Sequence, residues 1–248
     1  MRPSVLALVG LLALSTAAAA QEPAPPEQLP VSRFAITPFL GVSIPYSTGT
    51  TFVFTEEFGS FAFQDERGGS AAAGLELEAR VAGPVSLLGS FVYSGSTEQR
   101  TTLVSEEGDV TSLLSDTPEM WMGRLAVSYR LPEPRPDNRR FHPAGMIFVG
   151  PALVRTNWAD GDLGDDLDDI THWGINFGVH AATRLGSSRR VALHLGLEDY
   201  LTFWNTDRLV ARETVRFGRL FDEDTVVDMD FNASNLLLVR AGLSFRFR

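Results

Sequence analysis

Residues 71–82 read AAAGLELEARVA, and the side chains of this stretch alternate between two chemical kinds. Leu75 and Leu77 occupy one set of alternate positions, and Glu76 and Glu78 occupy the other. Successive side chains of a β-strand point to opposite faces of the sheet. The stretch therefore predicts a strand with one apolar face and one ionic face.

The same alternation recurs along the chain and predicts eight strands. Several of them are much longer than the about five or six residues usual in globular proteins, and they match the about 9–11 residues that a tilted membrane strand needs. The predicted strands span residues 34–45, 71–82, 85–95, 119–131, 143–155, 170–185, 191–204 and 234–247.

Long and short connections take turns between these strands. The long ones are residues 46–70, 96–118, 156–169 and 205–233, and short ones join the strands between them. An up-and-down barrel in a membrane has this order, with long loops at one end and short turns at the other. The sequence thus predicts an all-β fold, an eight-stranded antiparallel up-and-down transmembrane β-barrel.

The polar faces of the strands combine long charged residues with glycines, as a narrow barrel interior requires. A soluble lipocalin-like barrel also alternates, but it keeps its apolar residues inside. We therefore expect the ionic faces to line the lumen and, because arginines outnumber glutamates there, some arginines to reach the rims. The predicted lumen polar network consists of Glu76, Glu78, Arg80, Arg124, Arg130, His180, Arg184, His194, Glu198, Arg240 and Arg246.

The end of the chain carries a second signature. Residues 242–247 read GLSFRF, which resembles the C-terminal assembly signal of outer-membrane proteins, with Gly242 followed by aromatic residues at Phe245 and Phe247. Arg248 is a departure, because that signal usually ends on the aromatic residue. With the eight strands, this signal makes residues 34–247 similar to the small OmpA/OmpX-type barrels of the porin-like outer-membrane β-barrel family.

The resemblance implies a location and partners. It implies a monomer in the outer membrane of a Gram-negative bacterium, surrounded by outer-membrane lipid and lipopolysaccharide. It also implies that the barrel-insertion machinery reads the terminal signal. It rests on architecture and not on a catalytic motif, so it implies no activity and no cofactor.

The N-terminal segment predicts export. Arg2 precedes an apolar run over residues 5–14 and small residues up to Ala20, the order of a secretory signal peptide. We expect a signal peptide over residues 1–20, a proline-rich periplasmic linker over 21–32 and the barrel domain over 33–248.

Composition excludes several classes of function. The chain has no cysteine, so disulfides, thiol nucleophiles and thiolate metal sites are absent. Its formal net charge is −10 at pH 7, which opposes nucleic-acid binding because an acidic chain repels phosphates.

One connection is strongly acidic and is a weak candidate for a Ca²⁺ site. Calcium takes six to eight oxygen ligands, but the order of residues here does not fit the EF-hand loop. A solvated acidic loop is the alternative, because charge runs are usually solvated. The carboxylates are Asp160, Asp162, Asp165, Asp166, Asp168 and Asp169.

The first long connection alternates well enough to extend the first hairpin beyond the membrane. Its aromatic residues form either a binding surface or a lid that packs over the barrel mouth. They are Phe52, Phe54, Phe58, Phe61 and Phe63.

We expect no enzyme activity and no catalytic residue. The sequence has no G-x-S-x-G motif, and His194 with Glu198 is the one histidine–carboxylate pair at plausible spacing on a strand face, without a serine nucleophile. The leading hypothesis is a non-enzymatic outer-membrane barrel with a structural or surface-interaction role at the cell envelope. A narrow pore for small solutes and a soluble periplasmic lipocalin-like binding protein are the alternatives.

Overall fold

The structure is a computed structural model, and part of the chain is described in it. No helix among the described residues is both long and apolar enough to cross a membrane. The described residues are 33–46, 50–55, 59–95, 98–105, 110–116, 119–131, 143–157, 170–185, 190–220, 224–229 and 233–247. The predicted signal peptide and linker, the acidic run and His142 lie outside these ranges.

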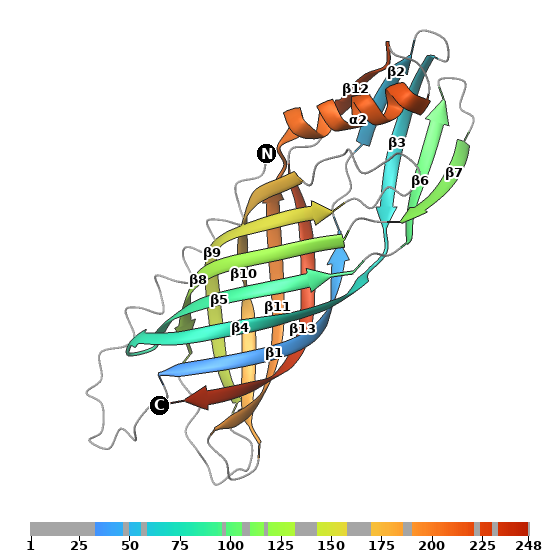
Figure 1. The fold of residues 1–248 in the computed structure, drawn as a ribbon. Coiled ribbons are helices and arrows are strands. Elements are labelled where there is room, and N and C mark those ends of the chain that lie inside the picture. Colours follow the sequence, from blue (N-terminus) through green and yellow to red (C-terminus); the bar gives the residue numbers. More distant parts are fainter. Residues whose placement is uncertain are drawn as a thin grey trace, which may run out of the picture. The chain divides into compact units, whose positions relative to one another are not determined.

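Eight antiparallel strands close into a barrel, which confirms the predicted fold class (Figure 1). In barrel order the strands are β1 (Phe34–Pro45), β13 (Ala233–Phe247), β11 (Val191–Phe203), β10 (Ile170–Arg184), β9 (Pro143–Asn157), β8 (Glu119–Arg130), β5 (Val85–Ser94) and β4 (Ser70–Ala82).

The first and last strands close the barrel. β1 pairs with β13, with Phe34 opposite Phe247 and Ile44 opposite Leu237. Each barrel strand thus pairs with two neighbours, so that backbone N–H and C=O groups are satisfied without a free sheet edge. The predicted short turn between β4 and β5 contains Gly83, whose φ of 50° is a backbone conformation that favours glycine.

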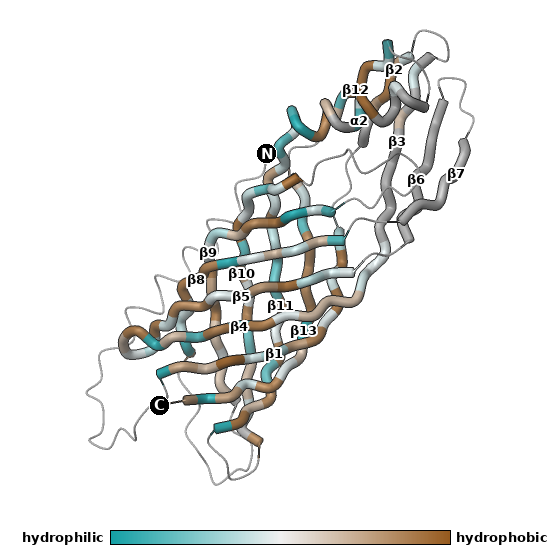
Figure 2. The backbone as a smooth tube through the Cα atoms, viewed as in Figure 1, coloured by the Kyte–Doolittle hydropathy of each residue, from teal (hydrophilic) through white to brown (hydrophobic). Residues whose placement is uncertain are grey.

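The two faces of the barrel differ in chemistry, and the apolar residues face outward. Leu40 and Leu125 are each 71% exposed, whereas Glu76 and Arg124 on alternate positions are buried. The hydropathy colouring of Figure 2 shows brown, apolar residues alternating with paler ones along the barrel strands. This arrangement is the reverse of a water-soluble barrel.

A second, five-stranded sheet has the strand order β12-β2-β3-β6-β7. Its strands come from three connections that leave the same end of the barrel, and the last connection also contains the helix α2 (Thr206–Leu220). The strands are β2 (Thr50–Thr55), β3 (Gly59–Arg67), β6 (Glu98–Ser105), β7 (Val110–Asp116) and β12 (Val226–Met229).

The first connection continues the β1–β4 hairpin, as predicted: Ser43 of β1 is opposite Ser70 of β4, and further along Thr50 of β2 is opposite Gln64 of β3. The sequence did not predict that this extension becomes the inner part of a larger sheet, in which β12 pairs with β2 and β6 pairs with β3. These two outer strands come from distant connections. Such pairing depends on the tertiary fold, because two short strands alone form only a marginal sheet.

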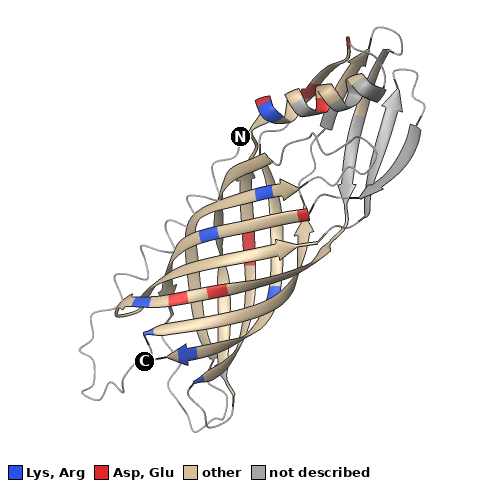
Figure 3. Cartoon of the chain, in the orientation of Figure 1, with Lys and Arg blue, Asp and Glu red and all other residues tan. Residues whose placement is uncertain are grey.

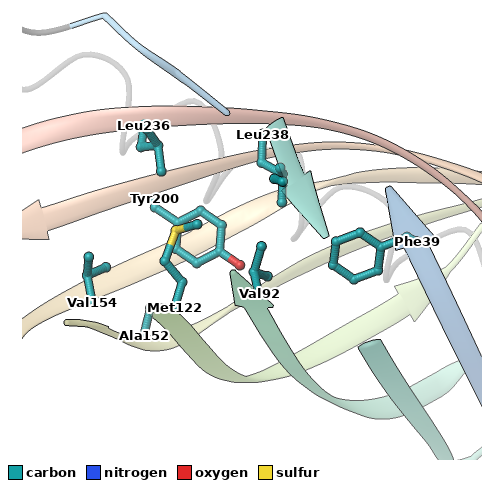
Figure 4. Packing of buried hydrophobic residues seen from close by; sticks show 9 residues of the cluster. Phe39, Val92, Met122, Ala152, Val154, Tyr200, Leu236 and Leu238 are labelled. Atoms are coloured by element: carbon teal, nitrogen blue, oxygen red, sulfur yellow. The ribbon is translucent and has the colours of Figure 1, made fainter. Parts of the chain in front are cut away.

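Apolar side chains also fill part of the lumen (Figure 4). Phe39, Val92, Met122 and Tyr200 lie in one buried cluster with Leu238. Val92 and Tyr200 are close to the strand ends from which the long connections leave. The lumen is therefore not uniformly ionic, because these inward apolar residues form a layer of the core.

Candidate functional site

Four charged side chains from four strands meet inside the barrel. Glu76 lies on β4, Arg124 on β8, Glu198 on β11 and Arg240 on β13, each at an inward position of its strand. Their side chains are at most 2% exposed. Figure 3 shows that charged residues are sparse along the barrel strands. Four of them nevertheless lie together in the lumen.

Each carboxylate contacts both arginines. Arg240 Nη2 lies 2.5 Å from Glu76 Oε2, and its Nε lies 2.5 Å from Glu198 Oε1. Arg124 Nη1 lies 3.0 Å from Glu198 Oε2, and Arg124 also forms an ion pair with Glu76. Two positive and two negative charges thus interlock, which offsets the cost of removing them from water. We call these four residues the lumen ion cluster.

Two histidines border the lumen ion cluster. His180 Nε2 lies 3.0 Å from Glu198 Oε1 and 2.8 Å from Arg240 Nη2. The rings of His180 and His194 are 4.6 Å apart in an edge-on arrangement. The predicted pair of His194 with Glu198 is therefore replaced by a pair of His180 with Glu198, because β10 and β11 are neighbours in the barrel.

Glu76, His180 and His194 also have the donor types of a metal site. One ligand atom from each lies within 4.8 Å of the others. Zinc takes such nitrogen and oxygen ligands. Arg240, however, already contacts both Glu76 and His180, so a cation would have to displace a guanidinium group. The arrangement is that of an ion-pair cluster.

Glycines and aromatic rings make room for the arginines. A Cβ atom on Gly196 would lie 2.8 Å from His180 Cδ2 and 2.9 Å from Arg240 Nε, so a larger residue there would displace both side chains from the lumen ion cluster. Arg124 lies 4.1 Å over the ring of Phe148, and Arg240 lies 4.2 Å over the ring of Phe39. Such cation–π contacts stabilise a guanidinium that has lost its hydration.

The other predicted lumen residues lie towards the end with the short turns. Arg130 Nη2 contacts Glu78 Oε1 at 2.8 Å, and both side chains are partly exposed. Arg80 Nε donates to the carbonyl of Gly83 at 2.6 Å. Arg246 lines a cavity of about 20 Å³ together with Glu76, Glu78, His180 and His194. The side chain of Arg184 lies outside the described residues.

Two further polar residues of the described lumen, which the predicted network does not contain, contact the lumen ion cluster. Asn176 Oδ1 accepts a hydrogen bond of 2.5 Å from Arg124 Nη1, and the hydroxyl of Tyr200 donates to Glu198 Oε2 at 3.4 Å. Both residues occupy the alternate positions that form the polar face of their strands, so their positions alone indicate that they face the lumen. The predicted network contains only residues that are commonly charged, and these two side chains are neutral at pH 7.

Polar contacts also join three strands near the end from which the long connections leave. The hydroxyl of Tyr46 donates to Asp199 and accepts a hydrogen bond of 2.7 Å from Asn235 Nδ2. Partial burial and the bond to Asp199 raise the pKa of Tyr46 above its usual value of about 10. At the other end, the aromatic residues of the predicted assembly signal, Phe245 and Phe247, are 40% and 50% exposed on the outer face.

Comparison with known proteins gives similarity in structure but not in sequence. No family model matches the chain, and no curated protein matches it by sequence. The outer membrane protein OprG from Pseudomonas aeruginosa is similar at a TM-score of 0.51 with 12% identity, covering 88% of this chain and 97% of that one. The outer membrane protein AlkL is similar at 0.40 with 15% identity, covering 92% and 97%. Neisserial surface protein A is similar at 0.42 with 8% identity, covering 88% and 100%. The chain has the fold of the small eight-stranded outer-membrane β-barrels.

Proposed function

We propose that this chain is a non-enzymatic outer-membrane barrel without an open channel, which anchors an interaction surface at the cell envelope. The signal peptide over residues 1–20 would direct export, and N-terminal sequencing of the exported protein should find Gln21 first. The outward apolar band supports insertion in lipid, because such a face in water would cause association.

The observation that carries the proposal is the filled lumen. Two successive layers close it, the lumen ion cluster and the apolar cluster around Val92, Met122 and Tyr200. Barrels with eight strands have an interior that side chains fill, whereas water-filled channels belong to larger barrels. A continuous path for solutes would require both layers to move apart.

We assign the interaction surface to the long connections. Three of them supply a five-stranded sheet and a helix, which is more structure than a loop needs to reverse the chain. Phe245 and Phe247 are exposed on the outer face of the terminal strand, where the barrel-insertion machinery would recognise them. The two buried histidines His180 and His194 lie among the arginines and glutamates of the lumen, where we assign them a structural role.

Recordings of the refolded protein in planar bilayers test the proposal. We expect no reproducible single-channel steps for the wild-type chain. The conductance of the wild type is compared with that of the folded double variant Arg124→Ala with Arg240→Ala, which lacks both arginine side chains of the lumen ion cluster. Steady conductance by the wild type would overturn the closed-barrel proposal in favour of the narrow pore. A wild-type chain that is folded and monomeric in buffer without detergent would overturn the membrane location in favour of the soluble binding protein.

A further inference from the structure

The second sheet has a covered face and an open face where β2 pairs with β12. Val53 of β2 lies opposite Val227 of β12, and these side chains are 0% and 4% exposed. The helix α2 contacts β12, and its Leu209 is buried as well (Figure 1). Alternate residues of a strand point to opposite sides of a sheet. We therefore place α2 over the side that carries Val53 and Val227, and the residues between them face the open side.

The open face carries an exposed apolar patch. Phe54 of β2 lies directly opposite Val226 of β12, and these side chains are 44% and 59% exposed. Phe52 and Ala62 lie opposite each other on the same face and are partly exposed. An exposed, contiguous apolar patch with polar residues at its rim is typical of a protein interaction site. We call Phe52, Phe54, Ala62 and Val226 the open-face patch.

Carboxylates flank the open-face patch. Asp228 of β12 lies opposite Phe52 and is exposed, and Asp224, two residues before the start of β12, is exposed as well. Positions 224, 226 and 228 are alternate positions, so that a carboxylate precedes and follows Val226 along the open face. The side chains that the structure describes on this face of β2, β3 and β12 include no arginine. The rim of the patch is therefore negative.

We propose that the open-face patch binds an extended cationic peptide segment of a protein partner, in which an apolar side chain stands between two basic ones. The proposal rests on the interaction role proposed above and gives the chemistry of the partner. Charge complementarity selects it, because a second copy of this chain would bring carboxylates against carboxylates.

The spacing of the partner follows from the strand. An extended peptide has the same two-residue repeat as β12. Basic side chains at its positions i and i+4 would therefore face Asp224 and Asp228, and the apolar side chain at i+2 would contact Val226 and Phe54.

Nuclear magnetic resonance titration of the full chain, refolded in zwitterionic detergent micelles, tests this proposal. The probe is the peptide Ser-Lys-Ser-Phe-Ser-Lys-Ser, and we expect saturable shifts of the backbone amide signals of β2 and β12. The peptide Ser-Ser-Lys-Lys-Phe-Ser-Ser has the same composition without the spacing, and it should bind about fivefold more weakly. Binding of the first peptide should also weaken at about 1 M salt, where the Debye length is about 3 Å.

A double variant of β12 tests the surface itself. Val226→Thr with Asp228→Asn should weaken binding of the first peptide by about fivefold to tenfold. Threonine keeps the β-branched shape, and asparagine keeps the oxygen that accepts a hydrogen bond from the backbone N–H of Met229. The matched control is Val215→Thr with Asp207→Asn, which makes the same two changes at exposed positions of α2. The control should bind within about twofold of the wild type.

Equal binding by the wild type and the β12 variant, with folding verified by heat-modifiable gel mobility, would overturn the proposal. An equal loss in the matched control, or equal binding of the two peptides, would also overturn it, because general charge would then explain the effect. Sedimentation of the wild type as a dimer that the β12 variant does not form would reassign the open-face patch to self-association. Failure of the proposed function is distinguishable from these outcomes. Single-channel steps, or a folded monomer in buffer without detergent, would overturn the closed membrane barrel whether or not the peptide bound.

Discussion

At the scale of single residues, the barrel interior is organised by charge pairing. Arg240 is the most connected member of the lumen ion cluster, with contacts to Glu76, Glu198 and His180. A buried ion pair contributes modestly to net stability, but removal of one partner leaves an uncompensated charge in a medium of low dielectric constant. The individual arginines should therefore differ in importance according to burial.

We predict that Arg240→Ala lowers the free energy of unfolding by about 3–5 kcal/mol, because Glu76 and Glu198 then share a single arginine. The measurement is a urea titration in micelles, with the folded fraction read from gel mobility. Arg130→Ala is the control, since its pair with Glu78 is partly exposed, and it should cost at most about 1 kcal/mol. If both variants lost a similar amount of unfolding free energy, burial would not be what makes the ion pairs of Arg240 important for stability.

At the scale of the strand, alternate positions decide the environment of each side chain: every second residue faces the lumen, and the residues between face outward. A shift of one residue in register would exchange the inner and outer faces. In β8, Leu125 is 71% exposed on the outer face while its neighbours Arg124 and Ala126 are buried in the lumen. The orientation of the faces can thus be tested at one position near the middle of a strand.

We predict that Leu125→Arg destabilises the barrel in a bilayer by about 2–4 kcal/mol, the cost of a cation on the lipid face near the midplane. Unfolding of the protein in liposomes by denaturant gives this value. Val215→Arg, on the exposed side of α2, changes a residue of 48% exposure outside the barrel strands and should stay within about 0.5 kcal/mol of the wild type. If Leu125→Arg were equally harmless, the outer face would be in contact with water.

At the scale of the whole molecule, the barrel and the second sheet differ in what they depend on. Every barrel strand is paired on both edges by other barrel strands, so closure needs none of the long connections. The second sheet instead depends on strands from three connections, with β3 at its centre between β2 and β6. The barrel should therefore tolerate the loss of the sheet.

We predict that replacing residues 97–117, which contain β6 and β7, by a short Gly-Ser turn leaves a folded, heat-modifiable barrel. A shorter loop also lowers the entropy cost of closing the β5–β8 hairpin. Gel mobility and circular dichroism of the refolded variant provide the measurement. Deletion of the β10–β11 hairpin is the control and should abolish folding, because it opens the barrel and leaves one edge of β9 and one edge of β13 unpaired. Loss of the barrel in the first variant would contradict its independence from the sheet.

The sequence alone determined the barrel, its eight strands and the identity of the inner and outer faces. It could do so because alternation along a strand is a local pattern. The apolar Leu75 indicates the outer face, and the charged Glu76 beside it indicates the inner face. Long-range contacts were beyond its reach. It showed Arg240 and Glu76 on inward positions but not that they meet, and it predicted the hairpin of β2 and β3 but not its outer neighbours β12 and β6.

The tertiary structure alone decided three things. It filled the lumen with an apolar layer around Met122, it paired His180 and not His194 with Glu198, and it joined the β2–β3 hairpin to β12 and β6 from other connections. Each of these outcomes depends on which distant residues become neighbours when the barrel closes, and closure joins the first strand to the last across the whole chain.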